Sequence, residues 1–156
     1  MIKNILVALD GSKSADKALD FALDLAEKYS ARIVLISVFE PLSVSVVASG
    51  MGFSPIQLSR HIDGLRDFRK NILKEAVNKA KKFKSGLTIS KKLIEGRPSD
   101  KIVETAKEEK IDLIVIGSRG LGGIKEFFLG SVSDRVADKA PCPVLIVKEK
   151  CSRIGS

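Results

Sequence analysis

The stretch GSRGLGGIKEFFLGS, residues 117–131, decides how the rest of the chain is interpreted. It follows the apolar run 111–116 and precedes a segment of helical periodicity at 131–139, so a glycine-rich loop joins a buried strand to the start of a helix. Glycines permit positive φ and let the backbone approach a ligand closely, and the free N–H groups of a helix start attract an anion. The stretch is therefore typical of a phosphate-binding loop.

The spacing of the glycines differs from the two common nucleotide fingerprints. Gly117 and Gly120 are separated by two residues, Gly120 and Gly130 by nine, and Ser131 follows directly. No Gly-Lys-Ser/Thr closes the loop as in a Walker A motif, and there is no G-x-G-x-x-G turn. Composition alone leaves two interpretations, a phosphate-binding loop or a tight connection that needed flexible residues.

Length and composition predict one ordinary folded domain. The chain has 156 residues, of which 44% are hydrophobic and 29% charged, enough for a sizeable single core. The formal charge of +8 would attract nucleic acid, membrane surfaces or nucleotides. Many lysines, however, lie between residues 70 and 92, where they alternate with acids or follow one helix face. A solvated surface is the favoured interpretation of that segment.

The cysteines and the apolar runs indicate the cellular compartment. Cys142 and Cys151 have no neighbouring histidine or further cysteine that would complete a metal site, so we expect free thiols in a reducing compartment. The chain does not open on a leader-like pattern, and no apolar run approaches the roughly 20 residues that cross a bilayer. We therefore expect a cytoplasmic protein without a membrane partner.

Periodicity predicts five strands alternating with four helices. Short apolar runs at 2–9, 32–38, 87–94, 113–116 and 144–147 indicate strands, the third nearer a sheet edge because one side carries lysines. Helical spacing recurs over 15–29, from 62 to 83, after Pro98 and over 131–139, with Ser12 or Ser14 placed to cap the first helix. This alternation predicts a three-layer α/β domain with a mostly parallel sheet.

Residues 40–60 show no sustained period. They mix serine, glycine, proline and apolar residues, which predicts a long loop. Such a loop serves as a lid or a partner surface, or is partly disordered, and the sequence leaves both open.

Two stretches resemble the universal stress protein family, in particular its ATP-binding branch. They are the opening IKNILVALDGSKSADKALDFALDLA and the later GSRGLGGIKEFFLGSVSDRVADKAPCPVLIVKE. The family's nucleotide motif, two glycines three positions apart, then nine residues, a third glycine and Ser or Thr, is matched in full by Gly117, Gly120, Gly130 and Ser131.

The resemblance implies an overall architecture. It covers residues 2–149 and is weakest over 40–60, so it implies a family domain at 1–149 and a polar tail at 150–156. The implied fold is a single Rossmann-like α/β domain whose five-stranded, mostly parallel sheet has the order 3-2-1-4-5, with helices on both faces. Its topological switch point lies between the first and fourth strands, where open α/β sheets bind ligands.

The resemblance also implies a site for ATP with Mg²⁺. The backbone at Gly117 and Gly120 would pass close to the ribose and phosphates, while N–H groups at Gly130 and Ser131 would bind the phosphates. Asp10 would accept a hydrogen bond from a ribose hydroxyl or help to hold Mg²⁺. The other implied site residues are Ala8, Leu9 and Val38 at the adenine, Arg119 and Ser133 at the phosphates, and Ile116 and Val132 beside the motif glycines.

Three of these assignments have a structural alternative. Asp10 could instead be a helix N-terminal charge or cap. Val38 could be an ordinary core residue. Arg119 could be a solvent-exposed loop residue.

The expected function is nucleotide-dependent regulation, in which bound ATP changes a loop or an interface. The alternative is slow ATP hydrolysis or autophosphorylation at the same site, because positioning and electrostatics alone support phosphoryl chemistry. No catalytic residue is assigned, since the single histidine, His61, is interpreted as a surface residue. The sequence leaves open whether ATP, ADP or AMP is preferred.

Two further expectations concern partners. In the family the last strand commonly pairs with its copy, so the apolar strand from Val144 to Val147 predicts a homodimer. Nucleic acid is disfavoured, because there is no helix-turn-helix and the aromatic residues lie mostly at core-periodic positions. A family fold that has lost the nucleotide is disfavoured too, because all four motif positions are present.

Overall fold

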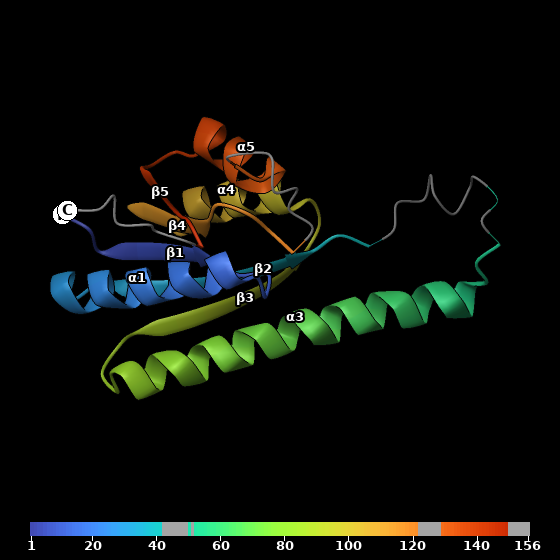
Figure 1. Cartoon of the computed structure of the whole chain (residues 1–156), viewed down its shortest axis with the longest axis horizontal. Helices are drawn as coiled ribbons and strands as arrows, with labels where there is room; N and C mark the ends of the chain where they lie inside the picture. The colour runs from blue at the N-terminus through green and yellow to red at the C-terminus, as the bar shows by residue number, and fades with distance from the viewer. Residues whose placement is uncertain (42–49, 51, 122–128, 150–156) are drawn as a thin grey trace.

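The fold is built on five parallel strands hydrogen-bonded in the order β3-β2-β1-β4-β5. The computed structural model describes residues 1–41, 50, 52–121 and 129–149. Figure 1 shows the twisted sheet with helices on both faces. The strands are β1 (Asn4–Ala8), β2 (Arg32–Phe39), β3 (Ile89–Glu95), β4 (Leu113–Gly117) and β5 (Val144–Val147). The predicted fold class and strand order are confirmed, with β3 at one edge of the sheet.

The helices form the two outer layers. On one face lie α1 (Lys13–Tyr29) and α3 (Pro55–Phe83), and on the other lie α4 (Pro98–Glu108) and α5 (Ser131–Lys139) (Figure 1). The core divides accordingly: Ile5 and Val7 of β1 pack towards α1 and α3, whereas Leu6 packs towards α4 and α5. Alternate strand residues point to opposite faces, so a strand covered on both sides is apolar throughout.

The first helix follows the strand after a short turn. Ser12 is the N-cap of α1, and its Oγ accepts a hydrogen bond from the backbone N–H of Ala15 at 3.2 Å. Of the two predicted caps, the structure therefore selects Ser12. Ser14 is buried and serves another purpose, described below.

The predicted loop over residues 40–60 is wrong in its last part. Residues 42–49 and 51 lie outside the described residues, but α3 already begins at Pro55, seven positions before the predicted start at Ile62. The reason is local: Ser54 caps the helix, Pro55 occupies its first turn, and Gln57 completes a capping box by accepting from the backbone N–H of Ser54 at 2.9 Å.

The prediction that most aromatic residues belong to the core is wrong for the described part of the chain. Phe39 is buried, but Phe21, Tyr29, Phe53, Phe68 and Phe83 are each at least 41% exposed. Periodicity placed Phe68 and Phe83 on the apolar stripe of α3. The side chains that α3 buries are smaller and lie in its later turns, namely Leu73, Ala76 and Ala80.

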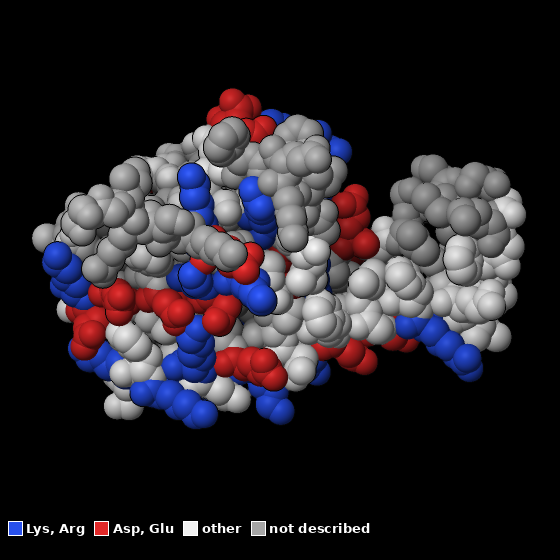
Figure 2. Space-filling model, viewed as in Figure 1, with Lys and Arg blue, Asp and Glu red and all other residues white. Residues whose placement is uncertain are grey.

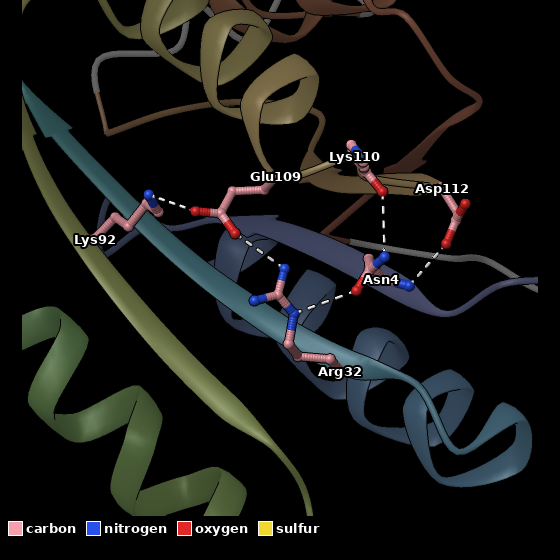
Figure 3. Close-up of polar contacts among 6 residues, drawn as sticks. All are labelled: Asn4, Arg32, Lys92, Glu109, Lys110 and Asp112. Carbon is pink, nitrogen blue, oxygen red and sulfur yellow. Dashed lines mark hydrogen bonds and ion pairs between the residues drawn. The ribbon is translucent and has the colours of Figure 1, made fainter.

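A polar network lies at the amino ends of the strands, opposite the edge that carries the glycine loop (Figure 3). Asp112, just before β4, accepts hydrogen bonds at Oδ2 from the backbone N–H groups of Lys3 and Asn4, both at 2.8 Å. The Asn4 side chain donates to the Lys110 carbonyl at 3.2 Å and accepts from Arg32 Nε at 3.2 Å. These bonds fix the register of β1 against β2 and β4.

Glu109 extends this network to the edge strand. It pairs with Arg32 at 2.9 Å and with Lys92 of β3 at 2.6 Å (Figure 3). Hydrogen bonds from Lys92 and Arg32 lower the pKa of Glu109, and hydrogen bonds from the backbone of Lys3 and Asn4 lower the pKa of Asp112. Both carboxylates therefore stabilise the fold in their charged form.

Candidate functional site

A cavity of about 900 Å³ lies at the carboxyl edge of the sheet, where the turn after β1 meets the loop after β4. These two strands are neighbours in the sheet, while the chain continues from β1 towards β2 and from β4 towards β5. The cavity therefore lies at the topological switch point, as predicted. Its volume falls within the range of small-molecule sites.

Every residue of the predicted site lines this one cavity. From β1, its turn and β2 come Ala8, Leu9, Asp10 and Val38; from the end of β4, the glycine loop and α5 come Ile116, Gly117, Arg119, Gly120, Gly130, Ser131, Val132 and Ser133. Residues far apart in the sequence thus converge where the resemblance places them. Residues 122–128 of the glycine loop lie outside the described part.

Gly117 and Gly120 are required by close approach and not by positive φ. None of Gly117, Gly120 and Gly130 has positive φ. A Cβ at Gly117 would lie 2.4 Å from Ser14 Oγ and 2.7 Å from the backbone nitrogen of Ala15, so the start of α1 packs directly on this glycine. A Cβ at Gly120 would lie 2.9 Å from Asp10 Oδ2. Both glycines therefore hold the loop against the β1 turn.

Asp10 connects the two loops through hydrogen bonds. Its Oδ1 accepts from the backbone N–H of Ser12 at 2.9 Å, and its Oδ2 accepts from the backbone N–H of Leu121 at 3.2 Å. Ser12 caps α1, so Asp10 is not the cap. The Asp10 carboxylate thus holds the glycine loop in place, and Asp10 itself also lines the cavity.

Ser14 forms a second connection between the loops. It is 3% exposed, and its Oγ donates to the Arg119 carbonyl at 2.6 Å. Sequence reasoning considered Ser14 only as a helix cap. A contact across 105 positions depends on how α1 crosses the end of β4, which residue types do not reveal.

The start of α5 is held by its own loop. The backbone N–H of Gly130 donates to the Ser118 carbonyl at 2.6 Å, and Ser133 Oγ lies 3.0 Å from that same carbonyl. The Gly130 N–H and the Ser133 hydroxyl proton are thus engaged within the protein. No side chain among the described residues caps α5, so the first-turn N–H groups of Ser131, Val132 and Ser133 are the groups available to an anion.

One wall of the cavity is apolar. It is formed by aliphatic side chains from the α4 and α5 side of the sheet, namely Ala8, Ile36, Val38, Ile102, Ile116 and Val132. Val38 is only 5% exposed, so it belongs to the core and to this wall at once. A flat apolar group such as a nucleobase fits such a wall. The N–H groups at the start of α5 line another part of the same cavity.

Sequence reasoning missed several lining residues. Leu121 and Ser12 lie within two positions of Gly120 and Asp10, and Ala15 packs on Gly117 in space. Ile36 and Ile102 are core residues whose exposure to the cavity depends on the packing of α4. The most distant is Arg69 of α3. The remaining lining residues are Pro98, Leu129 and Asp134.

Arg69 differs from the other missed residues because it brings a positive charge. Burial lowers the pKa of its guanidinium, and the neighbouring Asp10 carboxylate opposes that effect. An arginine remains charged despite such a shift. The cavity is therefore lined by cationic groups from α3 and from the glycine loop, where Arg119 lies.

Two lysines of α3 and the segment after it pair with acids of α1. Lys79 pairs with Asp16 and Asp20 of α1 at 2.8 and 2.7 Å, and Lys84 pairs with Glu27 at 3.0 Å. On the face seen in Figure 2, basic side chains are interspersed with acidic ones. No helix among residues 1–41, 50, 52–121 and 129–149 is long and apolar enough to cross a membrane.

Two residues considered in the sequence lie elsewhere. His61 is exposed on the early part of α3, consistent with a surface residue, and is not among the residues that line the cavity. Cys142 is half-buried before β5, packs against the α4 and α5 side of the core, and has its thiol pKa raised by burial. Within the described ranges no three His, Cys, Asp or Glu side chains cluster as metal ligands.

Comparisons with known proteins agree on one family. The sequence model described as the Universal stress protein family matches residues 1–148. A universal stress protein of Bacillus subtilis is 38% identical over 151 residues, covering 95% of this chain and 100% of that protein. The structure of a universal stress protein of Methanocaldococcus jannaschii matches with a TM-score of 0.82 at 28% identity, covering 97% of this chain and 99% of the other. A universal stress protein solved in complex with cAMP matches with a TM-score of 0.66 at 30% identity, covering 96% and 98%.

Proposed function

The chain belongs to the universal stress protein family, and we propose that it binds an adenine nucleotide, ATP with Mg²⁺, and acts as a nucleotide-dependent regulatory protein of the stress response. One observation carries the proposal. All four motif positions and the eight other predicted residues line a single cavity of about 900 Å³ at the switch point. The relative solved with cAMP also supports an adenine nucleotide as the ligand class.

The cavity offers a distinct environment to each part of a nucleotide. The apolar wall around Val38 and Ile116 suits the adenine. The uncapped first turn of α5 suits the phosphates, because its N–H groups and dipole favour negative charge. Asp10 lines the same cavity at the β1 turn, where its carboxylate can accept a hydrogen bond from a ribose hydroxyl.

Mg²⁺ fits this site only together with the nucleotide. Proteins hold Mg²⁺ through one or two carboxylates plus substrate phosphates and water. Asp10 supplies one carboxylate, although both of its oxygens already accept backbone hydrogen bonds. The ion would screen phosphate charge, while the chain's own residues bind and orient the nucleotide.

Analysis of bound nucleotide tests the proposal. The purified protein is denatured and the extract is separated by chromatography, with the unfolding temperature measured separately with and without added ATP and Mg²⁺. We expect adenine nucleotide in the extract or a rise in the unfolding temperature, because a ligand at about 100 times its Kd stabilises the folded state by about 2.7 kcal/mol. Absence of both would refute nucleotide binding. Added ATP recovered intact after long incubation would separate binding from slow hydrolysis or autophosphorylation.

We also propose a homodimer formed through β5. This strand is the last in the sheet. Its inner edge pairs with β4, and its outer edge pairs with no other described strand. An apolar edge strand left uncovered is an association hazard, which pairing with a second copy removes. The cytoplasmic location expected from the sequence stays a prediction.

A further inference from the structure

Helix α3 packs against the turn that carries Asp10. The helix contains no residue of the glycine motif. At Gly11, whose φ is +88°, an added Cβ would lie 3.0 Å from Ile72 Cδ1 and 3.5 Å from Phe68 Cζ. Phe68 and Ile72 therefore pack over this turn from successive turns of α3. Arg69 lies between them in the sequence and lines the cavity.

The polar head of Arg69 has an unmet hydrogen-bonding requirement. Its Nε is buried and has no hydrogen-bond partner among the residues that the structure describes. Its guanidinium lies 6.0 Å from the Phe68 ring, a contact that satisfies no N–H donor. Buried polar groups are normally hydrogen-bonded, and a guanidinium offers five donors in a fork that matches carboxylate or phosphate.

Asp10 is the nearby acid, but its oxygens are engaged. Oδ1 accepts from Ser12 and Oδ2 accepts from Leu121, both backbone N–H groups. No ion pair joins Arg69 to Asp10 or to another described acid, although Asp10 is close enough to raise the pKa of Arg69. The charge of Arg69 is therefore directed at the cavity without a protein acceptor in the described chain.

We propose that Arg69 binds the phosphate groups of the nucleotide, which makes α3 a further contributor to the site beside the β1 turn, the glycine loop and α5. The inference rests on the proposed function and adds a residue that the glycine motif does not contain. A phosphate would supply the acceptor that Nε lacks. It would also place negative charge between Arg69 and the uncapped start of α5, both of which line the cavity.

The location of Arg69 in α3 gives this contact a structural consequence. All residues that α3 buries follow Arg69, at Leu73, Ala76 and Ala80, while the first turns of the helix extend past the sheet (Figure 1). One turn before Arg69, Arg66 still contacts Phe39 of β2 and pairs with Glu95 of β3. Arg69 thus lies near the start of the packed part of the helix. A phosphate bound there would add a contact between the domain and α3 near the start of its packed part.

Titration of four ligands into matched variants tests the inference. The ligands are adenosine, AMP, ADP and ATP, the last two with Mg²⁺, and the variants are Arg69→Gln and Lys70→Gln. Lys70 is exposed at the next position, so its variant removes the same charge away from the cavity. We expect Arg69→Gln to weaken ATP by about 10-fold or more, because charge-assisted hydrogen bonds are lost. Adenosine should bind the wild type and Arg69→Gln equally, and Lys70→Gln should change ATP affinity by less than about 2-fold.

A third variant guards against an effect on folding. Arg69→Lys keeps the charge but not the planar fork, so its ATP affinity should fall between those of the wild type and Arg69→Gln. Equal ATP affinity of wild type and Arg69→Gln would overturn the inference alone, leaving the proposed function in place. Equal loss for adenosine and ATP would also overturn it, since Arg69 would then support the cavity and not the phosphates. If the wild type binds none of the four ligands, the proposed function itself fails.

Discussion

At Gly117 and Gly120 the steric surroundings explain the motif better than backbone conformation does. Both glycines have ordinary φ, yet an added Cβ would meet Ser14 or Asp10 at less than 3 Å. Gly130 is less constrained, with the nearest atom, the Ser118 carbonyl oxygen, at 3.3 Å. The motif therefore combines two glycines that bring the loop against the β1 turn with one at the helix start.

A substitution at Gly117 tests this steric account. In Gly117→Ala the new methyl group would lie 2.4 Å from Ser14 Oγ and 2.8 Å from the Ser14 carbonyl carbon, so the start of α1 must shift. We expect the free energy of unfolding to fall by about 2 kcal/mol or more, as measured by urea denaturation. Gly64→Ala is the control, because no atom lies within 4 Å of that Cβ and alanine favours a helix. Equal stability of wild type and Gly117→Ala would contradict the account.

The residues of the site were predictable to the extent that they adjoin the two switch-point strands. Asp10 follows β1 and Gly117 ends β4, so strand order alone brings them together. Arg69 was not predictable, because it lies in the middle of a long helix whose pattern shows an ordinary polar position. Its exposure to the cavity depends on the angle at which α3 crosses the β1 turn.

At the scale of elements, the start of helix α3 is marked by a capping sequence that hydrophobic periodicity does not reveal. Ser54, Pro55 and Gln57 form a cap that is readable from the sequence, since Ser with Gln three positions later and Pro between them are helix-start residues. The residues of this cap were assigned to the predicted loop because residues 40–60 as a whole show no hydrophobic periodicity. The later part of α3 was predicted well, since its apolar spacing is regular.

The network at the amino ends of the strands predicts how stability depends on pH. The folded pKa of Asp112 is lowered by backbone hydrogen bonds from Lys3 and Asn4. A lowered carboxyl pKa contributes stability above the unfolded value, near 3.9, which is lost as the pH falls through the folded pKa. Asp112→Asn should therefore be less stable than wild type by about 1 kcal/mol at pH 6.

Urea denaturation of both proteins at several pH values checks this prediction. The difference between wild type and Asp112→Asn should shrink as the pH falls below about 4. Asp24→Asn, at an exposed position of α1, controls for the loss of one negative charge. A difference that stays constant down to pH 2.5 would show that Asp112 does not act through its charge.

For the whole molecule, the outer edge of β5, which pairs with no described strand, predicts the oligomeric state. Hydrogen bonds from Ile114 N to the Pro143 carbonyl and from Ser118 N to the Val147 carbonyl show that odd-numbered residues of this segment bond to β4. The backbone N–H of Ile146 therefore points away from β4, because alternate residues of a strand bond to opposite sides. Light scattering should give about twice the chain mass of 16.9 kDa.

Substitution of Ile146 separates edge pairing from packing. Ile146→Pro removes the outward N–H and should give a folded monomer, whereas Ile146→Ala loses packing but keeps the N–H and should remain dimeric. A wild-type protein that stays monomeric at high concentration would contradict the predicted dimer.

Much of the overall architecture was predictable, for a physical reason. Alternating apolar runs and amphipathic helices dictate a parallel α/β sheet, and the resemblance to a known family supplied the order of its strands. Periodicity could not assign the aromatic residues of α3, since Phe68 and Phe83 fit the stripe yet lie largely exposed. Only the packing of the sheet against its helices decides which positions of the stripe are covered.

Calorimetric titration of ATP with Mg²⁺ into the wild type, Gly130→Val and Gly64→Val tests the central claim, that the cavity at the switch point binds the nucleotide. Gly130 lines the cavity and Gly64 is exposed on α3, so the two variants carry the same substitution inside and outside the site. We expect micromolar binding by the wild type and by Gly64→Val, and loss of binding in a folded Gly130→Val. Absence of binding by the wild type, or undiminished binding by Gly130→Val, would contradict that claim.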